Sequence, residues 1–116
     1  MQIQVKGRNV AISDELTEHV QTRFKKVARQ VSELARLEVE IWEERNPANP
    51  DRHVAEVSLH IKGAILRAHD ASGDLKHSIN LCAEELARQV KRDRDKRRRR
   101  REQRARPRTS DASVGL

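Results

Sequence analysis

The sequence feature that most constrains the fold is a stripe of apolar residues near the start of the chain. Its members recur at spacings of three and four residues, which is the repeat of one face of an α-helix. They are Leu16, Val20, Phe24, Val27, Val31 and Leu34. Ser13 is a suitable N-cap, and Asp14 and Glu15 suit the positive end of the helix dipole. The stripe predicts a helix over roughly residues 14–33 that buries one face.

Three other segments alternate apolar and polar residues, which is the repeat of a strand with one buried face. These segments are 2–6, 37–43 and 55–62. The turn sequence NPANPD at 46–51 joins the last two, which should therefore form a hairpin. After Gly63, residues 65–70 predict a fourth and less regular strand. Trp42 interrupts the alternation, and we expect it to cover a sheet edge or to sit at a bulge.

A second apolar stripe at helical spacing follows the strands. It consists of Leu75, Ile79, Cys82, Ala83, Leu86 and Val90. Asp74 is a suitable N-cap for this helix, and neither glycine nor proline interrupts the sequence before Pro107. Beyond Val90 the helix has no apolar face to bury, so we expect a charged extension that projects from the domain. Residues 107–116 have the composition of a disordered tail.

The order strand, helix, three strands, helix (β-α-β-β-β-α) predicts an α+β fold. Because each strand has one apolar and one polar face, we expect a four-stranded, mainly antiparallel sheet with both helices packed on one side. The chain should divide into a folded domain, residues 1–96, and a basic helical extension with a tail, residues 97–116.

The net charge of +7 comes entirely from the second part of the chain. Residues 1–73 contain 11 basic and 11 acidic residues, whereas residues 74–116 contain 14 basic and 7 acidic residues. All six residues from Lys96 to Arg101 are basic. So concentrated a positive field attracts polyanions, of which nucleic acid is the commonest, and guanidinium groups match phosphate geometry. A solubilising tail is the alternative.

The remaining composition indicates how RNA would be held. Phe24 belongs to an apolar stripe and Trp42 is the only other aromatic residue, so the chain lacks a platform for stacking bases. Binding should therefore depend on RNA shape and backbone charge. The outer side of the sheet carries a run of acidic residues, Glu38, Glu40, Glu43 and Glu44. This acidic patch is either a solvated surface that protects an edge strand or a surface that turns away from RNA.

Sequence motifs for catalysis are missing. The chain has no phosphate-binding glycine-rich loop, no GxSxG and no HExxH, so we expect no enzyme activity, cofactor or metal. His60, His69 and Asp70 suggest a metal site, but outward-facing histidines on a sheet are more often solvated. The single cysteine, Cys82, lies on an apolar stripe and should be a buried thiol. With neither a disulfide pair nor a signal-peptide core, the chain should be soluble and cytoplasmic.

Several segments resemble the ribosome hibernation promoting factors, also called the ribosome-associated inhibitor or sigma-54 modulation family. The likeness covers about residues 1–96. It rests on MQIQVKGRNVAISDEL at the start, RFKKV (23–27), EERNP (43–47), HIKGAILRAHDASGDLKHSI (60–79) and ELARQVKRDRDK (85–96). The order and spacing of these segments are more specific than any one of them.

The resemblance implies a domain similar in shape to double-stranded RNA-binding domains. It also implies binding to the small ribosomal subunit, through its 16S rRNA near the decoding centre, and to the 70S ribosome. Such binding would block the mRNA and tRNA sites in starvation or stationary phase. By position, the RNA-binding residues would be Arg23 and Lys26 on the first helix and Arg88, Lys91, Arg92, Arg94 and Lys96 on the second. We add Arg97, Arg98 and Arg99 from the basic run as candidate RNA-binding residues.

Two residues depart from the family pattern. Lys76 stands where the family often has a tyrosine, and Glu85 stands where it commonly has a lysine, so the start of the RNA-binding surface is less positive. Long family members add a dimerisation domain that is not found here, and the chain is either a short form or the first half of a long one. The alternative function is a generic double-stranded RNA-binding or RNA-chaperone module without ribosome specificity.

Overall fold

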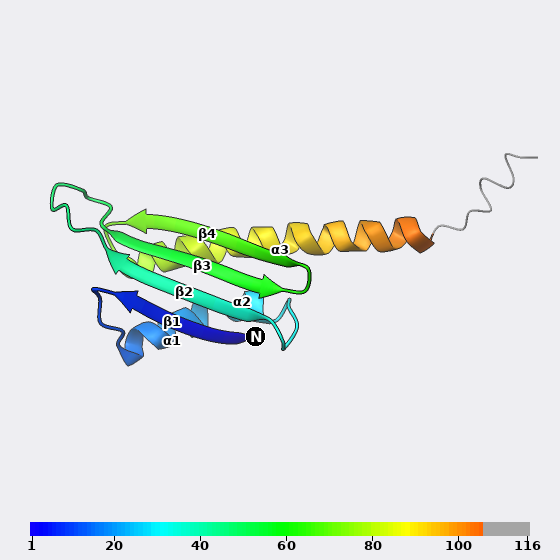
Figure 1. Ribbon diagram of the computed structural model, residues 1–116, viewed down its shortest axis with the longest axis horizontal. Coiled ribbons are helices and arrows are strands. Elements are labelled where there is room, and N and C mark those ends of the chain that lie inside the picture. Colours follow the sequence, from blue (N-terminus) through cyan, green and yellow to red (C-terminus); the bar gives the residue numbers. More distant parts are fainter. Residues whose placement is uncertain (106–116) are drawn as a thin grey trace, which may run out of the picture.

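The computed structural model describes residues 1–105, which form a sheet of four strands covered on one face by helices (Figure 1). Strand β1 is followed by two helices, three strands and a long final helix. Their bounds are β1 Gln2–Arg8, α1 Asp14–Arg23, α2 Lys25–Ala28, β2 Arg36–Glu43, β3 His53–Ile61, β4 Ala64–Ser72 and α3 Leu75–Ala105. The predicted α+β fold, with its element order, is confirmed.

The strands lie in the order β1-β2-β3-β4, so neighbours in sequence are neighbours in the sheet. The pairs β2–β3 and β3–β4 are antiparallel, but β1 and β2 run parallel. A parallel pair requires a crossover connection, which α1 and α2 provide by returning the chain across the sheet. The sheet is therefore mixed, with two of its three pairings antiparallel, and the helices lie on one face as expected.

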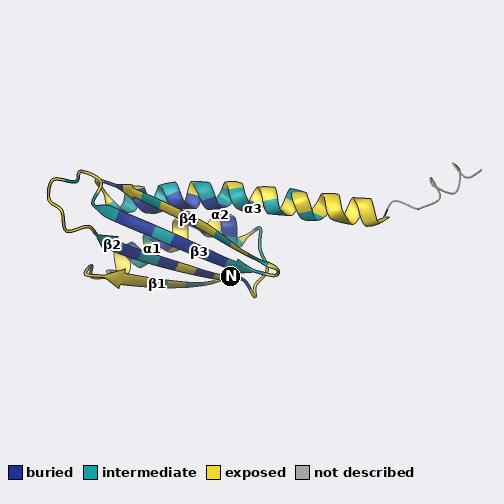
Figure 2. Ribbon diagram, turned by 45° about the horizontal axis from the view of Figure 1, so that its top comes forward, coloured by how far each residue is buried: buried dark blue, intermediate teal, exposed yellow. Residues whose placement is uncertain are grey.

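The hydrophobic core lies between the inner face of the sheet and the helices. Figure 2 shows buried residues concentrated along β2 and β3 and on the side of α3 that faces them. Fully buried side chains on the sheet are Leu37, Val39, Ile41, Ala55, Val57 and Leu59, and on the helices Val20, Phe24, Ile79, Cys82 and Leu86. Because α3 is buried only as far as Val90, its basic second half continues past the sheet to Ala105.

The start of α3 is fixed to the sheet by a buried polar contact. The Ser78 hydroxyl is fully buried and lies 2.6 Å from the carbonyl oxygen of His53 and 2.6 Å from the hydroxyl of Ser72. One turn later, the thiol of Cys82 donates to the carbonyl oxygen of Ala55 at 3.3 Å. These contacts join the first turns of α3 to β3 and β4.

The first helix is shorter than the apolar stripe predicts. At Phe24 the backbone turns out of the helix (φ −94°, ψ 7°), and the short α2 ends at Ala28. The stripe prediction is wrong at its end, since Leu34 is 93% exposed and Ala35 takes the buried place. The Ser32 hydroxyl accepts from the Leu34 N–H at 3.1 Å, and such a side-chain contact competes with helical hydrogen bonding.

Trp42 does not sit at a bulge. Strand pairing runs through it without interruption, opposite Arg8 on β1 and Val54 on β3. Its ring lies on the face away from the helices, and the Arg8 guanidinium stacks over it, 4.2 Å from the ring centroid. The buried Val54 lies beside it on that face. Arg8 of the edge strand β1 therefore covers the Trp42 ring, whereas we expected Trp42 to cover the edge of the sheet.

The division of the chain at residue 96 stays a prediction. Helix α3 runs through this position to Ala105. The predicted tail, residues 107–116, lies outside the described residues.

Candidate nucleic-acid interface

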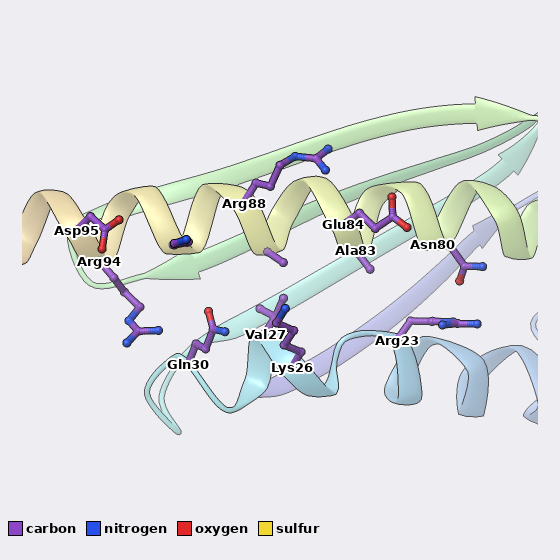
Figure 3. Close-up of a pocket in the computed structure, with 12 residues that line it drawn as sticks. Arg23, Lys26, Val27, Gln30, Asn80, Ala83, Glu84, Arg88, Arg94 and Asp95 are labelled. Carbon is purple, nitrogen blue, oxygen red and sulfur yellow. The ribbon is translucent and has the colours of Figure 1, made fainter.

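A groove of about 600 Å³ separates α1 and α2 from α3 on the helical face (Figure 3). One wall carries Arg23, the last residue of α1, and Lys26 of α2. The other wall carries Arg88, Lys91 and Arg94 of α3. Five of the ten predicted RNA-binding residues are therefore brought together from segments more than sixty positions apart.

The break at Phe24 explains how the first wall forms. Phe24 and Val27 point into the core, and Arg23 and Lys26, each one position before them, are left exposed at the groove. Lys25, on the same short helix, is also exposed but does not line the groove. On the opposite wall, the small side chains of Ala83 and Ala87 leave space between the helices.

Four of the groove cations have no ion-pair partner in the part of the chain that the structure describes. Within residues 1–105, Arg23, Lys26, Lys91 and Arg94 form no ion pair. Glu84 and Asp95 are the two carboxylates that line the groove, and Asp95 lies 3.9 Å from Arg98. Unpaired, solvent-facing cations on two facing walls are suited to an anionic backbone lying between them.

Arg88 is engaged elsewhere, although it lines the groove. Its guanidinium donates twice to the Glu85 carboxylate, at 2.7 and 3.1 Å, and Figure 3 shows it directed away from Arg23 and Lys26. Arg92 approaches the same carboxylate at 3.4 Å. Hydrogen bonds from Arg88 and then Gln89 hold the pKa of Glu85 below its usual value, so this carboxylate is charged and partly neutralises both arginines.

The other predicted residues lie outside the groove. Arg92, Lys96 and Arg99 line a separate hollow of about 480 Å³ with Leu66 of β4 and Gln89. Arg97 pairs with Asp93 at 3.0 Å and also donates to the carbonyl oxygen of Lys62 in the β3–β4 turn. Arg98 lies between Asp95 at 3.9 Å and Glu102 at 4.0 Å. The basic residues of α3 thus point to different sides of the helix.

Sequence reasoning missed several residues of this surface. Gln30 and Asn80 line the groove as neutral hydrogen-bonding groups, and Asn80 also lies 2.9 Å from Nε2 of His19. Neither belongs to a charge run or an apolar stripe, so no sequence signal marked them. Lys76, in the place where a family tyrosine was expected, bonds to Glu15 and ties the start of α3 to α1.

Three of the four carboxylates of the acidic patch, those of Glu40, Glu43 and Glu44, have a partner within the chain. Glu40 binds Arg8 at 2.6 Å, Glu43 lies 3.6 Å from Arg52, and Glu38 lies 3.7 Å from His60. Glu44 accepts a hydrogen bond from the Trp42 indole at 3.0 Å. This pairing favours the interpretation of a solvated surface over one that repels RNA.

The strand register separates the histidines of the metal hypothesis. His60 lies opposite Ile65, whereas His69 lies opposite Glu56, four residues further along the strands. Within the part of the chain that the structure describes, no cluster of three metal-binding side chains occurs.

Cys82 is fully buried, as the stripe predicted. Burial, together with the nearby Asp70 carboxylate, raises the pKa of its thiol to about 12, so the thiol is protonated and unreactive.

The mixed sheet, the helices on one face and the cationic groove between them define an α+β protein with one basic helical surface. The chain belongs to the Sigma 54 modulation protein / S30EA ribosomal protein family, whose sequence profile matches residues 3–98. This bears out the resemblance in the sequence. Among residues 1–105, no helix has the length and apolar character that crossing a bilayer requires.

Named relatives agree with this assignment. The chain is 27% identical over 93 residues to a "Ribosome hibernation promotion factor" of Picosynechococcus sp., covering 79% of this chain and 48% of the relative. It is 28% identical over 95 residues to the "Ribosome hibernation promoting factor" of Salmonella typhimurium, covering 82% and 95%. It thus spans about half of the first relative and nearly all of the second.

The fold is similar to that of the Thermus thermophilus Protein Y N-terminal domain. The TM-score is 0.67 at 24% identity, and the alignment covers 79% of this chain and 98% of the other.

Proposed function

We propose that the chain is a non-enzymatic ribosome hibernation factor. It binds the small ribosomal subunit near the decoding centre, through 16S rRNA, and blocks the mRNA and tRNA sites in stationary phase or stress. The family and the names of its relatives support a ribosomal role. The observation that carries the proposal is the groove, where four cations that form no ion pair among residues 1–105 line facing helices.

The groove residues make the primary contacts in this proposal. Arg23 and Lys26 hold the RNA backbone from one side, and Lys91 and Arg94 hold it from the other. Arg88 and Arg92 also contact the RNA backbone, after a phosphate replaces Glu85 as their ion-pair partner. Lys96 continues the contact along α3, and Arg97, Arg98 and Arg99 carry it into the proposed basic extension, residues 97–116.

Occlusion is tested by competition for the small subunit. Purified 30S subunits are loaded with a fluorescent mRNA and initiator tRNA, and the protein is added at physiological salt. Displacement of both ligands is expected, at protein concentrations above the Kd for the free subunit, because the bound ligands compete. If the protein binds loaded and empty subunits equally well and displaces neither ligand, the occlusion mechanism is refuted.

A generic double-stranded RNA-binding module is the second candidate, because the groove presents cations without an aromatic platform. Such a module would bind a plain RNA duplex as tightly as the small subunit at the same salt. The same titration with a 20-base-pair duplex as probe, a length of about two helical turns, separates the two functions. A strong preference for the subunit supports the hibernation role.

A further inference from the structure

A second hollow continues the groove toward the open end of the sheet. It lies between the connection that follows α2, the end of β3 and α3, and it measures about 740 Å³. Gln30 and Arg94 line both the groove and this hollow, so the two adjoin at these residues. Ligand pockets for small molecules measure about 300–1,000 Å³, and the hollow is within this range.

The hollow has an apolar floor, unlike the groove. Val31 comes from the connection, Ile61 ends β3 and Val90 ends the buried part of α3, and Leu34 stands at the edge of this floor. Leu34 is 93% exposed and makes no part of the core, yet its backbone N–H is held by Ser32 at 3.1 Å. An exposed leucine beside a continuous apolar floor offers contact area that the fold itself leaves unused.

The rim of the hollow is cationic. Arg36, Lys62 and Arg94 line it and form no ion pair among residues 1–105. Asp93 is the one carboxylate of its lining, and it is paired with Arg97 at 3.0 Å. A ligand that fits must therefore combine a compact apolar part with negative charge at its edge.

We propose that this hollow receives one unstacked nucleotide of the RNA held in the groove. The base lies on the apolar floor against Leu34, and the flanking phosphates reach Arg36, Lys62 and Arg94. Unpaired RNA positions can turn a base outward in this way. The continuity of the hollow with the groove favours a nucleotide over an acidic peptide. The inference rests on the proposed function and adds a base-binding site to a surface otherwise suited to backbone charge.

Titration of the isotope-labelled full chain, followed by amide NMR signals, tests the site directly. The probes are AMP, GMP, CMP and UMP, with inorganic phosphate as the reference for charge alone. Nucleotides are expected to shift the amides of residues 31–35 and of Ile61, whereas phosphate shifts those near Arg36 and Lys62. If phosphate reproduces the nucleotide shifts, or if no nucleotide at about 10 mM shifts residues 31–35, the inference is refuted.

A pair of exposed apolar residues supplies the matched variants. Leu34→Ser removes floor contact at a side chain that is 93% exposed, and Ile65→Ser makes a similar change at 50% exposure outside the hollow. Leu34→Ser should weaken nucleotide binding about threefold to tenfold, from lost apolar contact, while Ile65→Ser leaves it unchanged. Leu34→Met should restore the affinity. Equal loss in Leu34→Ser and Ile65→Ser would refute the site.

Two further outcomes separate this inference from the proposed function. If 30S binding depends on Lys26 but the nucleotides do not bind, the hollow fails and the ribosomal role stands. If the nucleotides bind but wild-type protein does not sediment with 30S subunits, the ribosomal role fails and the hollow stands. An acidic, leucine-containing peptide that displaces AMP and binds more tightly would overturn the choice of ligand.

Discussion

The groove can be tested with two neighbouring lysines of α2. Lys25 and Lys26 are both exposed, but only Lys26 lines the groove. Lys25→Gln and Lys26→Gln therefore remove the same charge from the same short helix, and the net charge of the two variants is equal. Because the long-range field changes alike in both, any difference in RNA affinity reports a local contact.

The expected difference follows from counterion release. One phosphate contact contributes about 0.9 to the slope of log affinity against log salt, which at 0.15 M amounts to about a fivefold change in affinity, or ~1 kcal/mol. The four unpaired groove cations would give a slope of about 3.6, so their share of the affinity should fall about 150-fold between 50 and 200 mM salt. Lys26→Gln should lower that factor to about 40-fold, and Lys25→Gln should leave it unchanged.

The measurement is fluorescence anisotropy of labelled protein with 30S subunits, titrated at several KCl concentrations and constant Mg²⁺. Thermal unfolding of both variants provides the control, since neither lysine is buried and both proteins should keep the wild-type midpoint. Equal losses of affinity and equal slopes in the two variants would show that total charge governs binding. The groove would then have no specific role.

Four further outcomes are expected. Glu85→Gln should raise 30S affinity about twofold to fivefold at low salt by releasing two arginines, and a weaker complex would refute this. Deletion of residues 97–116 should flatten the salt dependence of 30S binding, whereas an unchanged slope would assign the segment to solubility. Replacing Glu38 and Glu40 with Gln should leave 30S affinity nearly unchanged, and a large gain would show that the patch repels RNA. Because the pKa of the Cys82 thiol is raised to about 12, the contribution of this thiol to stability is present below about pH 9 and declines as pH rises toward 12. At pH 8, Ellman's reagent should react with Cys82 only after the protein is unfolded in urea, and rapid reaction of the native protein would contradict the burial of the thiol.

The sequence by itself determined the elements and most of the core. Periods of 3.6 and 2 are local properties, because they depend only on how side chains repeat around a helix or along a strand. They identified the strands, the start of the first helix and the buried side of α3, including Cys82. The end of the stripe at Val90 likewise marked the last buried residue of α3.

The same periodicity failed where a local pattern continued into a loop. Leu34 fits the helical spacing, but the chain must leave α2 early enough to enter β2 in register with β1. That requirement comes from strand pairing across the sheet. Trp42 shows the same limit, since its neighbours Arg8 and Val54 come from different strands and no local pattern links them.

Only the tertiary structure decided which of the ten predicted cations share the groove. Charge counting placed the surplus of positive charge in α3 and did not distinguish Lys25 from Lys26. In the structure, which breaks the helix at Phe24, only Lys26 lines the groove. Charge counting also could not show that Arg88 is ion-paired with Glu85, whereas Lys91 and Arg94 form no ion pair within residues 1–105. The helical repeat determines the direction in which a side chain points from the axis of its helix. Which residues face it across the groove depends on how the helices pack on the sheet.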